Sequence, residues 1–402
     1  MNTQNPRFLL VTFPIFYLTL FFQSACAQED ILRRWQRLMI EAEAGDTIHL
    51  PAGRFYFSRS LSLDEKENVV IQGAGMHATV LSFKNQTDGA EGLKINHCRR
   101  VVLADFSVED ARGDAIKASF CEDITFKNIF TRWTGKPSTK NGAYGLYPVS
   151  CEGVLIEGCR AEGASDAGIY VGQSRRVRVL NSLARRNVAG IEIENCSDAE
   201  VAGCTAVDNT GGILVFDLPE LPVKSGSRIR VHHNTVIRNN HRNFAPRGNI
   251  VGQVPPGTGL MVLSGSQVSL DHNWVADNKT ASCAIVSFYI SGRPYKDSLY
   301  NPYPREITVS QNTFTRRRRI PALSHTIGFL AFLKFGRRTP HILYDGILPQ
   351  GVSGPNPHAI CIGHNENGTF AMLDAGNRFR KISKAMEPYR CEGRVVSLIR
   401  NP

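Results

Sequence analysis

A short pattern of hydrophobic and polar positions recurs through the middle of the chain. The segments AGIYVGQS (167–174), AGIEIENC (189–196) and GGILVFDL (211–218) follow one another at a spacing of 22 residues. Apolar side chains alternate with other residues in each segment, and alternation with a period of two is typical of β-strands. A repeat of this length is typical of a solenoid, in which each unit buries its apolar face against the next.

Each repeat starts with a second alternating run, as in RVRVLNS (176–182), AEVAGCT (199–205) and RIRVHHN (228–234). These runs are rich in valine and isoleucine, and glycine and asparagine separate them, which indicates strands joined by turns. With one coil per repeat, the chain forms long parallel sheets stacked along one axis. The sequence therefore predicts an all-β solenoid of about 22 residues per coil.

Alignment of the repeats predicts which side chains stack inside the solenoid. Equivalent positions in neighbouring coils lie about 4.8 Å apart, so each column of the alignment is an internal ladder. One column reads Cys98, Cys121, Cys151, Ser174 and Cys196, and another reads Cys159, Ser182, Cys204, Asn234, Asn273 and Asn312. We interpret the stacked thiols as small buried side chains that fill a narrow core. Cys361 and Cys391 lie outside the ladders and form the one disulfide that we predict.

The N-terminal segments resemble those of a known family. ILRRWQRLMIEA (31–42) looks like the amphipathic helix that caps right-handed parallel β-helix proteins, and AGDTIHLPAGRFYF (44–57) and NVVIQGAG (68–75) look like their first coils. The resemblance is to pectate lyase-like proteins of the carbohydrate-binding and sugar-hydrolase type, which include polygalacturonases and alginate epimerases. It implies a right-handed parallel β-helix over residues 28–315 that acts on a polysaccharide.

The resemblance leaves the reaction open. The Gly-His-Gly and Arg-Ile-Lys signatures of polygalacturonases and the Asp-Pro-His-Asp signature of the epimerases are absent. A polysaccharide lyase, glycoside hydrolase or C5-epimerase therefore stands beside a non-catalytic module that binds a glycan or another envelope component. A structural spacer of the envelope is the third alternative, because the fold alone does not decide the function.

The N-terminus has the features of a secretory signal. An apolar run follows a single arginine, and Ala25-Cys26-Ala27 ends the segment, so residues 1–27 are predicted to be a signal peptide. The protein is then exported, to the periplasm or beyond the cell, and Cys26 leaves a lipid-anchored form open. The remaining sequence has no second long apolar stretch, so we expect no transmembrane segment.

The repeat fades after about residue 315. We expect residues 316–402 to form an extension that packs on the solenoid or caps it. Within it, the run Arg316–Arg319 is interpreted as a solvated surface. The apolar segment IGFLAFLKF (327–335) is expected to pack back on the side of the solenoid or to cover its end.

The charge of the chain favours an acidic partner. The formal net charge is +11, and +10 remains when Arg7 of the predicted signal is removed. A basic exported protein encounters acidic polysaccharides or the anionic surface of the envelope, so we expect a polysaccharide partner and no nucleic acid. We expect the protein to be a monomer.

The two glutamates of AGIEIENC are the candidate catalytic residues. Because side chains alternate across a strand, Glu192 and Glu194 should point outward while the isoleucines point inward. Aromatic and charged side chains occupy the same outward columns in other coils, and these are Lys117, Tyr147, Tyr170 and Phe216. We interpret this strip as an exposed floor on which sugar rings stack, with Tyr147, Tyr170 and Phe216 as binding residues.

Two insertions flank this strip. Residues 133–142 enlarge one coil and residues 241–257 enlarge another four coils further along, which places their walls roughly 19 Å apart. Both should rise on the same side, and the groove between them is the predicted binding site. Arg242 and Arg247, in the second insertion, are candidate ligands for the acidic groups of the substrate.

The groove allows two kinds of chemistry. Glu192 and Glu194 would have Cβ atoms about 7 Å apart, near the carboxyl separation of inverting glycoside hydrolases, with Asp166 or Asp217 as a partner. Alternatively, Lys117, Tyr170 or Arg242 serves as base or acid when a sugar C5 proton is removed, and Ca²⁺ held by Glu192, Glu194 and Asp217 neutralises a uronate. No metal site is certain, and the carboxylates could simply keep a solvent face soluble.

Three histidines near the asparagine ladder are interpreted as turn residues. His232, His233 and His272 lie in or beside the predicted turns, and no metal-ligand spacing links them to a third group.

Overall fold

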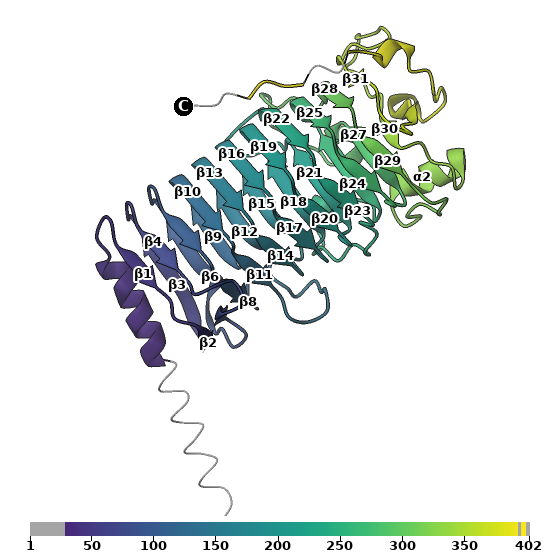
Figure 1. Cartoon of the computed structure of the whole chain (residues 1–402). Helices are drawn as coiled ribbons and strands as arrows, with labels where there is room; N and C mark the ends of the chain where they lie inside the picture. Colours follow the sequence, from purple (N-terminus) through teal and green to yellow (C-terminus); the bar gives the residue numbers. More distant parts are fainter. Residues whose placement is uncertain (1–28, 393–394, 399–402) are drawn as a thin grey trace, which may run out of the picture.

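The computed structural model describes residues 29–392 and 395–398, and its fold is a solenoid of three parallel sheets (Figure 1). We call them sheets A, B and C, in the order in which the chain enters them. Each coil but the last contributes one strand to every sheet. The predicted all-β parallel β-helix is confirmed. The predicted signal peptide, residues 1–27 with Cys26, lies outside the described residues.

Sheets A and B contain 11 and 10 strands. Sheet A consists of β1 (Thr47–His49), β4 (Val70–Gln72), β7 (Val102–Ala104), β10 (Glu122–Lys127), β13 (Glu152–Glu157), β16 (Arg175–Leu180), β19 (Ser197–Ala202), β22 (Ser227–His232), β25 (Ser266–Asp271), β28 (Arg305–Ser310) and β31 (Cys361–Ile362). Sheet B consists of β2 (Gly53–Tyr56), β5 (Thr79–Ser82), β8 (Ser107–Glu109), β11 (Phe130–Arg132), β14 (Arg160–Glu162), β17 (Leu183–Arg185), β20 (Thr205–Val207), β23 (Thr235–Ile237), β26 (Trp274–Ala276) and β29 (Thr313–Thr315).

Sheet C contains 11 strands, and short helical segments connect or cover the coils. Its strands are β3 (Arg59–Asp64), β6 (Asp88–Asn96), β9 (Ile116–Ser119), β12 (Tyr144–Val149), β15 (Ala167–Gly172), β18 (Ala189–Glu194), β21 (Gly211–Phe216), β24 (Thr258–Leu263), β27 (Ala281–Val286), β30 (Ile342–Tyr344) and β32 (Phe370–Met372). The helical elements are an N-terminal helix (29–41), η1 (Val251–Gln253), η2 (Phe288–Ser291), α2 (Thr326–Phe335), η3 (Ala375–Asn377) and η4 (Glu387–Tyr389).

The core is a stack of inward-facing aliphatic side chains. Ile169, Ile191 and Ile213 occupy successive rungs of sheet C and are almost completely buried. The six cysteines of the predicted ladders are all buried in this core, and Cys283, which the ladders did not include, is buried there too; the set is Cys98, Cys121, Cys151, Cys159, Cys196, Cys204 and Cys283. Cys361 and Cys391 form a disulfide, which confirms the predicted pair.

Asparagine side chains fix the tight turn between sheets A and B. The amide of Asn234 donates from Nδ2 to Oδ1 of Asn273 at 3.0 Å, and Asn273 repeats the contact to Asn312 at 2.9 Å. The residue before each of the first two asparagines has a positive φ, 54° at His233 and 53° at His272. Asn234, Asn273 and Asn312 therefore form the internal ladder that the repeat predicted, and they hold the two histidines in equivalent places on neighbouring coils.

The two ends of the solenoid are covered differently. Trp35 and Met39 of the N-terminal helix are buried against the first coils, so the helix caps the core as the resemblance implied. After residue 315, strands β30, β31 and β32 add to sheets A and C, and α2 lies on the outside of this last part (Figure 1). The extension thus both lengthens the solenoid and packs on it.

Candidate functional site

The outward columns of sheet C have the predicted register. Tyr170 pairs with Glu192, which pairs with Leu214, and Glu194 pairs with Phe216 in the next coil. Two coils earlier in the solenoid, Lys117 pairs with Tyr147 on the neighbouring strand. The repeat therefore assigned each of these side chains to the correct face and rung.

The exposure predicted for this strip is wrong. Tyr170, Glu192 and Phe216 retain only 3, 1 and 1% of their accessible surface. The reason is the second insertion, 241–257, which folds over the strip instead of standing beside it as a wall. Its apolar side chains Phe244, Val251 and Val254 form a second hydrophobic cluster with Tyr170, Leu214, Phe216, Met261 and Leu263.

The two arginines of this insertion lie on its outer side, and their binding role stays a prediction. Arg242 and Arg247 are exposed, whereas Asn249 of the same loop points inward. Lys117 lies near the uncovered end, where its ammonium group is 5.1 Å from the centre of the Tyr147 ring and 3.9 Å from Glu91. The structure therefore places Lys117 and Tyr147 at the edge of a covered region.

Three carboxyl groups are buried together under the insertion, and we call Asp166, Glu192 and Glu194 the carboxyl cluster. Tyr170 donates a hydrogen bond to Glu194 at 2.6 Å, and Asn249 donates one to Asp166 at 2.7 Å. Oε2 of Glu192 is buried and, within the described part of the chain, has no hydrogen-bond partner. Such a group is costly to bury, and its cost is lower when it is protonated.

Burial raises the pKa of every member of the carboxyl cluster. It raises the pKa of Asp166 and of Glu194 to about 7, and repulsion from Glu194 adds to the effect at Asp166. The pKa of Glu192 lies well above its ordinary range because of burial first and of repulsion from Asp166 and Glu194 second. Burial also raises the pKa of Asp217, at the end of β21, to about 7. These carboxyls carry protons at acidic and near-neutral pH.

No metal centre is assembled from the described residues. Across residues 29–392 and 395–398, no group of three or more histidine, cysteine, aspartate or glutamate side chains is placed to hold a metal ion. The calcium role suggested for Glu192, Glu194 and Asp217 stays a prediction.

Tyr170→Ala is expected to destabilise the protein by about 3 to 5 kcal/mol, because it leaves a cavity in a packed cluster and removes the hydrogen bond to Glu194. Tyr170→Phe keeps the ring and is expected to cost about 1 to 3 kcal/mol. Urea titration followed by circular dichroism measures both. A loss below about 0.5 kcal/mol for Tyr170→Ala would show that the insertion does not cover the ring in solution.

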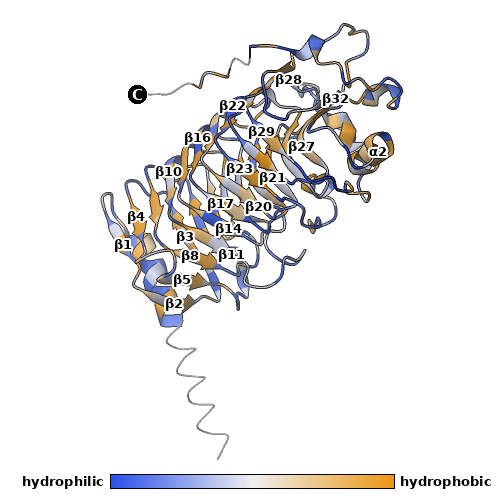
Figure 2. Ribbon diagram, turned by 45° about the vertical axis from the view of Figure 1, so that its right-hand side comes forward, coloured by the Kyte–Doolittle hydropathy of each residue, from blue (hydrophilic) through white to orange (hydrophobic). Residues whose placement is uncertain are grey.

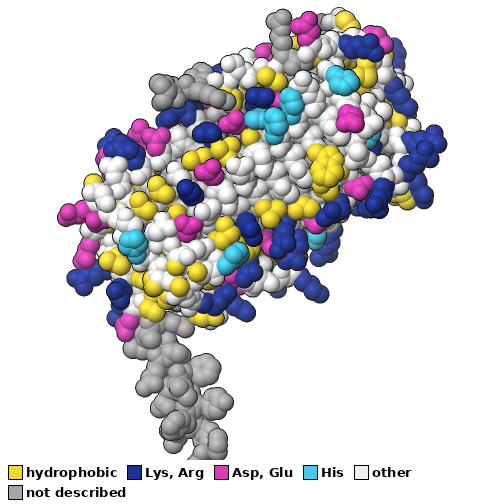
Figure 3. Space-filling model, viewed as in Figure 1, with side chains coloured by type: hydrophobic (Ala, Val, Ile, Leu, Met, Phe, Trp, Pro, Cys, Tyr) yellow, Lys and Arg dark blue, Asp and Glu magenta, His cyan; other side chains and the backbone are white. Residues whose placement is uncertain are grey.

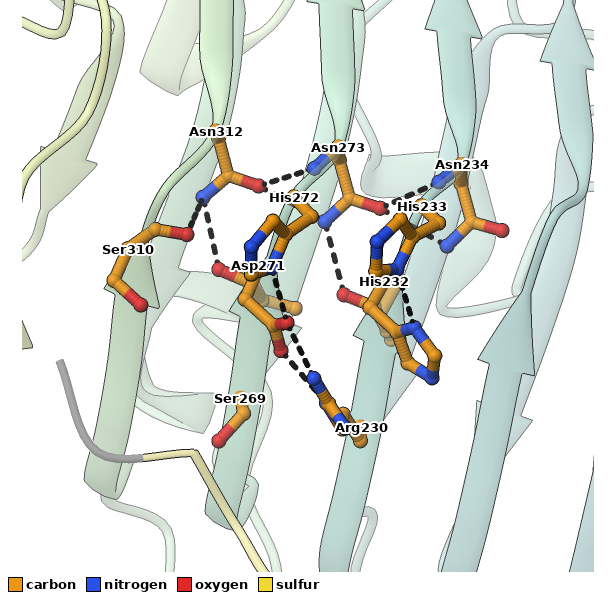
Figure 4. Close-up of polar contacts among 12 residues, drawn as sticks. Arg230, His232, His233, Asn234, Ser269, Asp271, His272, Asn273, Ser310 and Asn312 are labelled. Atoms are coloured by element: carbon orange, nitrogen blue, oxygen red, sulfur yellow. Dashed lines mark hydrogen bonds and ion pairs between the residues drawn. The ribbon is translucent and has the colours of Figure 1, made fainter.

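The open polar surface lies on the outer face of sheet A, where sequence analysis placed no site. We call His232, His233 and His272, together with Glu200 and Asp271, the imidazole cluster. Figure 4 shows His233 and His272 side by side at the ends of neighbouring strands. Their rings stack with centres 4.8 Å apart and planes inclined by 4°. Both histidines are exposed, whereas Asp271 is fully buried.

A buried carboxylate orients one exposed imidazole. Arg230 binds Asp271 through two hydrogen bonds, of 3.0 and 2.8 Å, and Nδ1 of His272 lies 2.9 Å from the same carboxylate (Figure 4). Burial raises the pKa of Asp271, but hydrogen bonds from Arg230 and His272 outweigh it and leave the pKa below its ordinary value. Since an ionised carboxylate only accepts, Nδ1 of His272 donates and Nε2 keeps a lone pair.

A second carboxylate orients the other exposed imidazole through a relay. Nε2 of His232 lies 3.1 Å from Glu200, and Nδ1 of His232 lies 2.8 Å from Nδ1 of His233. Glu200 also accepts from Arg178 at 3.3 Å. With His232 donating to Glu200, its Nδ1 accepts from His233, and Nε2 of His233 keeps a lone pair. Burial and the two neighbouring imidazoles lower the pKa of His233, which favours the neutral form of its ring.

A groove adjoins the imidazole cluster on the same face. Its cavity of about 400 Å³ is lined by β10, β13, β16 and β19, and Arg178 and Glu200 form part of its wall. Leu398 lines this cavity, and the residues before it lie further along the same face, where the backbone of Val396 donates to Oγ of Ser269 at 2.7 Å. The surface thus combines an open channel, cationic side chains and two imidazoles with available ring nitrogens.

Comparison with known proteins places the chain in a family. The model of the right-handed β-helix region matches residues 68–290, more than half of the sequence, and the chain belongs to this family. No curated protein matches the chain.

Several solved structures are similar at low sequence identity. The A-module of mannuronan C-5 epimerase AlgE4 from Azotobacter vinelandii has 14% identity and a TM-score of 0.48, with 80% of this chain and 86% of that chain covered. The periplasmic alginate epimerase AlgG has 14% identity and a TM-score of 0.43, with 69% and 76% covered. An alginate lyase from Paenibacillus sp. str. FPU-7 has 12% identity and a TM-score of 0.44, with 71% and 96% covered.

Proposed function

We propose that the protein is a carbohydrate-active enzyme that binds an acidic polysaccharide along the outer face of sheet A and removes the C5 proton of a uronate residue. The hydrogen bond of 2.9 Å between Asp271 and His272 is the main support for this proposal, because it holds an exposed imidazole with its free nitrogen available as a base. The long solenoid surface suits a polymer, and the basic charge of the chain suits an acidic one.

The chemistry starts at His272. Nε2 takes the C5 proton, and the electron pair left at C5 is stabilised by the adjacent carboxyl group of the substrate. In β-elimination this pair becomes the C4–C5 double bond, the C4–O bond breaks, and the leaving oxygen takes the proton from the imidazolium. In epimerisation, the C5–H bond re-forms on the opposite face of C5 with a proton supplied by solvent water, and no glycosidic bond breaks.

Arginine near the groove supplies charge for the uronate carboxylate. The side chain of Arg178 is 59% exposed and reaches the groove beside Glu200. A guanidinium binds a carboxylate through two parallel hydrogen bonds, which both orients the sugar and makes the C5 proton more acidic. Arg230 is committed to Asp271 and acts on the reaction by keeping that carboxylate ionised.

The carboxyl cluster is the second candidate site. Its raised pKa values and the unpartnered oxygen of Glu192 are features of groups that do acid-base chemistry. A substrate would reach Glu192 or Glu194 only after the insertion 241–257 had moved away, since both side chains are buried beneath it. Access therefore favours the imidazole cluster.

A substrate panel tests the proposed function. The protein is incubated with polyuronides and with neutral glycans, while ultraviolet absorbance reports elimination, reducing ends report hydrolysis, and exchange of the C5 proton with solvent reports epimerisation. We expect elimination or exchange with a polyuronide only. A chain ending at Glu392 is assayed in parallel, because Leu398 lines the groove and the residues before it lie on the same face. Binding of a polyuronide without any of the three signals would overturn the enzyme proposal and support a non-catalytic glycan-binding module.

A further inference from the structure

Helix α2 is attached to the solenoid by one face only. Gly328 and Ala331 are buried, and Ile327 and Phe335 pack against the second hydrophobic cluster. Figure 2 shows α2 as a hydrophobic helix at the outside of the molecule. Only Thr326 and Lys334 of its ten residues, TIGFLAFLKF, are polar, so no face of the helix is hydrophilic. A helix with this composition is normally covered on all sides.

The uncovered side exposes large apolar side chains to solvent. Phe329 and Leu333 on the helix are 48 and 60% exposed, and Ile320 and Leu323 just before it are 42 and 48% exposed. Single exposed apolar residues are common on protein surfaces, but four within fourteen positions form a patch. Such a patch is typical of a surface that contacts an apolar partner.

Cationic side chains flank this patch in the sequence, and all of them are exposed except Arg316, whose guanidinium turns inward and donates to the carbonyl of Thr339. Glu306 and Asp345 are the nearest acidic residues in the sequence on either side, and no acidic residue lies between them. The same interval contains seven cationic residues, namely Arg316, Arg317, Arg318, Arg319, Lys334, Arg337 and Arg338. Figure 3 shows Lys and Arg side chains gathered along this end of the molecule. In the described part of the chain, only Arg317 of this set lies within ion-pair distance of an acidic side chain, Asp277 at 3.8 Å.

The dimensions of α2 restrict how it meets a bilayer. Ten residues give a helix about 15 Å long, half the thickness of about 30 Å of a hydrocarbon core. Among the residues described, no helix is long and apolar enough to cross a membrane. A short helix with outward Phe and Leu side chains and flanking arginines fits a position in the plane of the interface.

We propose that α2 and the cationic residues that flank it dock the protein on the surface of an anionic phospholipid bilayer. The apolar side chains Phe329 and Leu333 enter the boundary between headgroups and acyl chains, while the arginines bind the lipid phosphates. An acidic polysaccharide would satisfy the same arginines. It would leave Leu333, Leu323 and Ile320 without an apolar environment, which is why the bilayer is the better partner.

Co-sedimentation with lipid vesicles tests this inference. The chain that begins at Gln28, after the predicted signal peptide, is expected to bind vesicles that contain phosphatidylglycerol and to bind vesicles of phosphatidylcholine alone at least about tenfold more weakly. Phe329→Ser with Leu333→Ser is expected to weaken binding by about tenfold or more through lost apolar burial. The triple variant Arg317→Gln, Arg318→Gln, Arg319→Gln is expected to bind these vesicles about a hundredfold more weakly at low salt.

The N-terminal helix provides matched controls at the opposite end of the solenoid (Figure 1). Leu38 and Ile40 are 41 and 63% exposed there, and Arg33, Arg34 and Arg37 are exposed beside them. The double variant Leu38→Ser, Ile40→Ser should leave vesicle binding unchanged. The triple variant Arg33→Gln, Arg34→Gln, Arg37→Gln should also leave it unchanged. Thermal unfolding of every variant reports whether it is folded.

Two outcomes would overturn the bilayer proposal. One is equal binding of the wild type and the Phe329→Ser, Leu333→Ser variant, combined with complete displacement by soluble polyuronate, which would assign the arginines to an acidic polymer. The other is an equal loss of vesicle binding in the N-terminal control variants, which would show that binding depends on net charge and apolar surface in general.

Discussion

His272→Gln is expected to lower the turnover of a polyuronide by about a hundredfold or more, because it removes the base and keeps the size and part of the hydrogen bonding of the side chain. His272 is exposed, so the free energy of unfolding should change by less than about 0.5 kcal/mol. Initial rates from the elimination or exchange assay, taken with the urea midpoint of the same preparation, measure both quantities. The variant separates chemistry from folding more cleanly than a change at buried Asp271 would.

A second histidine supplies the control for this experiment. His97 also lies in a turn with positive φ, is exposed, and stacks on Phe120 with ring centres 5.1 Å apart. His97→Gln should leave turnover unchanged. Full activity in His272→Gln, together with a large loss in Glu194→Gln, would transfer the site from the imidazole cluster to the carboxyl cluster and require the insertion to open.

The register was predictable because the repeat contains it. A period of two within each strand and of 22 between coils decides which side chains point inward and which share a rung. This is why Glu192 was correctly placed between Tyr170 and Leu214, and why the thiol and asparagine ladders were found. Alternation describes only the strand itself, however, and says nothing about what a loop from another coil places over it.

The covering of the strip depends on tertiary packing of a loop. Phe244, Val251 and Val254 in the insertion 241–257 were the available signal, since three large apolar residues in a surface loop need a place to be buried. Phe216 was the other half of that signal, because an aromatic side chain on an outward rung offers such a place. Together, these residues indicate that the insertion covers the outward strip of sheet C.

The three histidines were identified from the sequence, but their grouping with Glu200 and Asp271 was missed because the members of the cluster are far apart in the sequence. His232 and Asp271 are separated by 39 positions, since the insertion lengthens the coil between them, yet they occupy the same rung of sheet A. Aligned by coil, His233 and His272 also fall on the same turn position. Their stacking, and the link from His232 to Glu200, depend on side-chain geometry that the alignment suggests only after the coils have been paired.

The second large effect is expected in the pH dependence of stability. Burial raises the folded-state pKa of Asp166, Glu194 and Asp217 to about 7 and that of Glu192 well above its ordinary range, whereas these groups have ordinary pKa values of about 4 in an unfolded chain. Between pH 4 and pH 7 the folded protein therefore binds more protons than the unfolded chain. The stabilisation that these groups contribute is fully present below pH 4 and is lost as pH rises through the folded-state pKa values.

Glu192→Gln combined with Glu194→Gln isolates this contribution, because glutamine keeps the size and cannot ionise. The double variant should be no more stable than the wild type at pH 4. It should gain on the wild type by several kcal/mol as the pH rises from 4 through the folded-state pKa values, because over that range the unfolded wild type releases protons that its folded form retains. Urea titrations at closely spaced pH values give the difference in the free energy of unfolding. Glu122→Gln, on the exposed surface of β10, is the control whose stability should follow that of the wild type at every pH.

A constant difference between double variant and wild type across this range would mean that both glutamates are ionised in the folded protein. That result would require solvent to reach them under the insertion, and it would restore the carboxyl cluster as a site open to substrate.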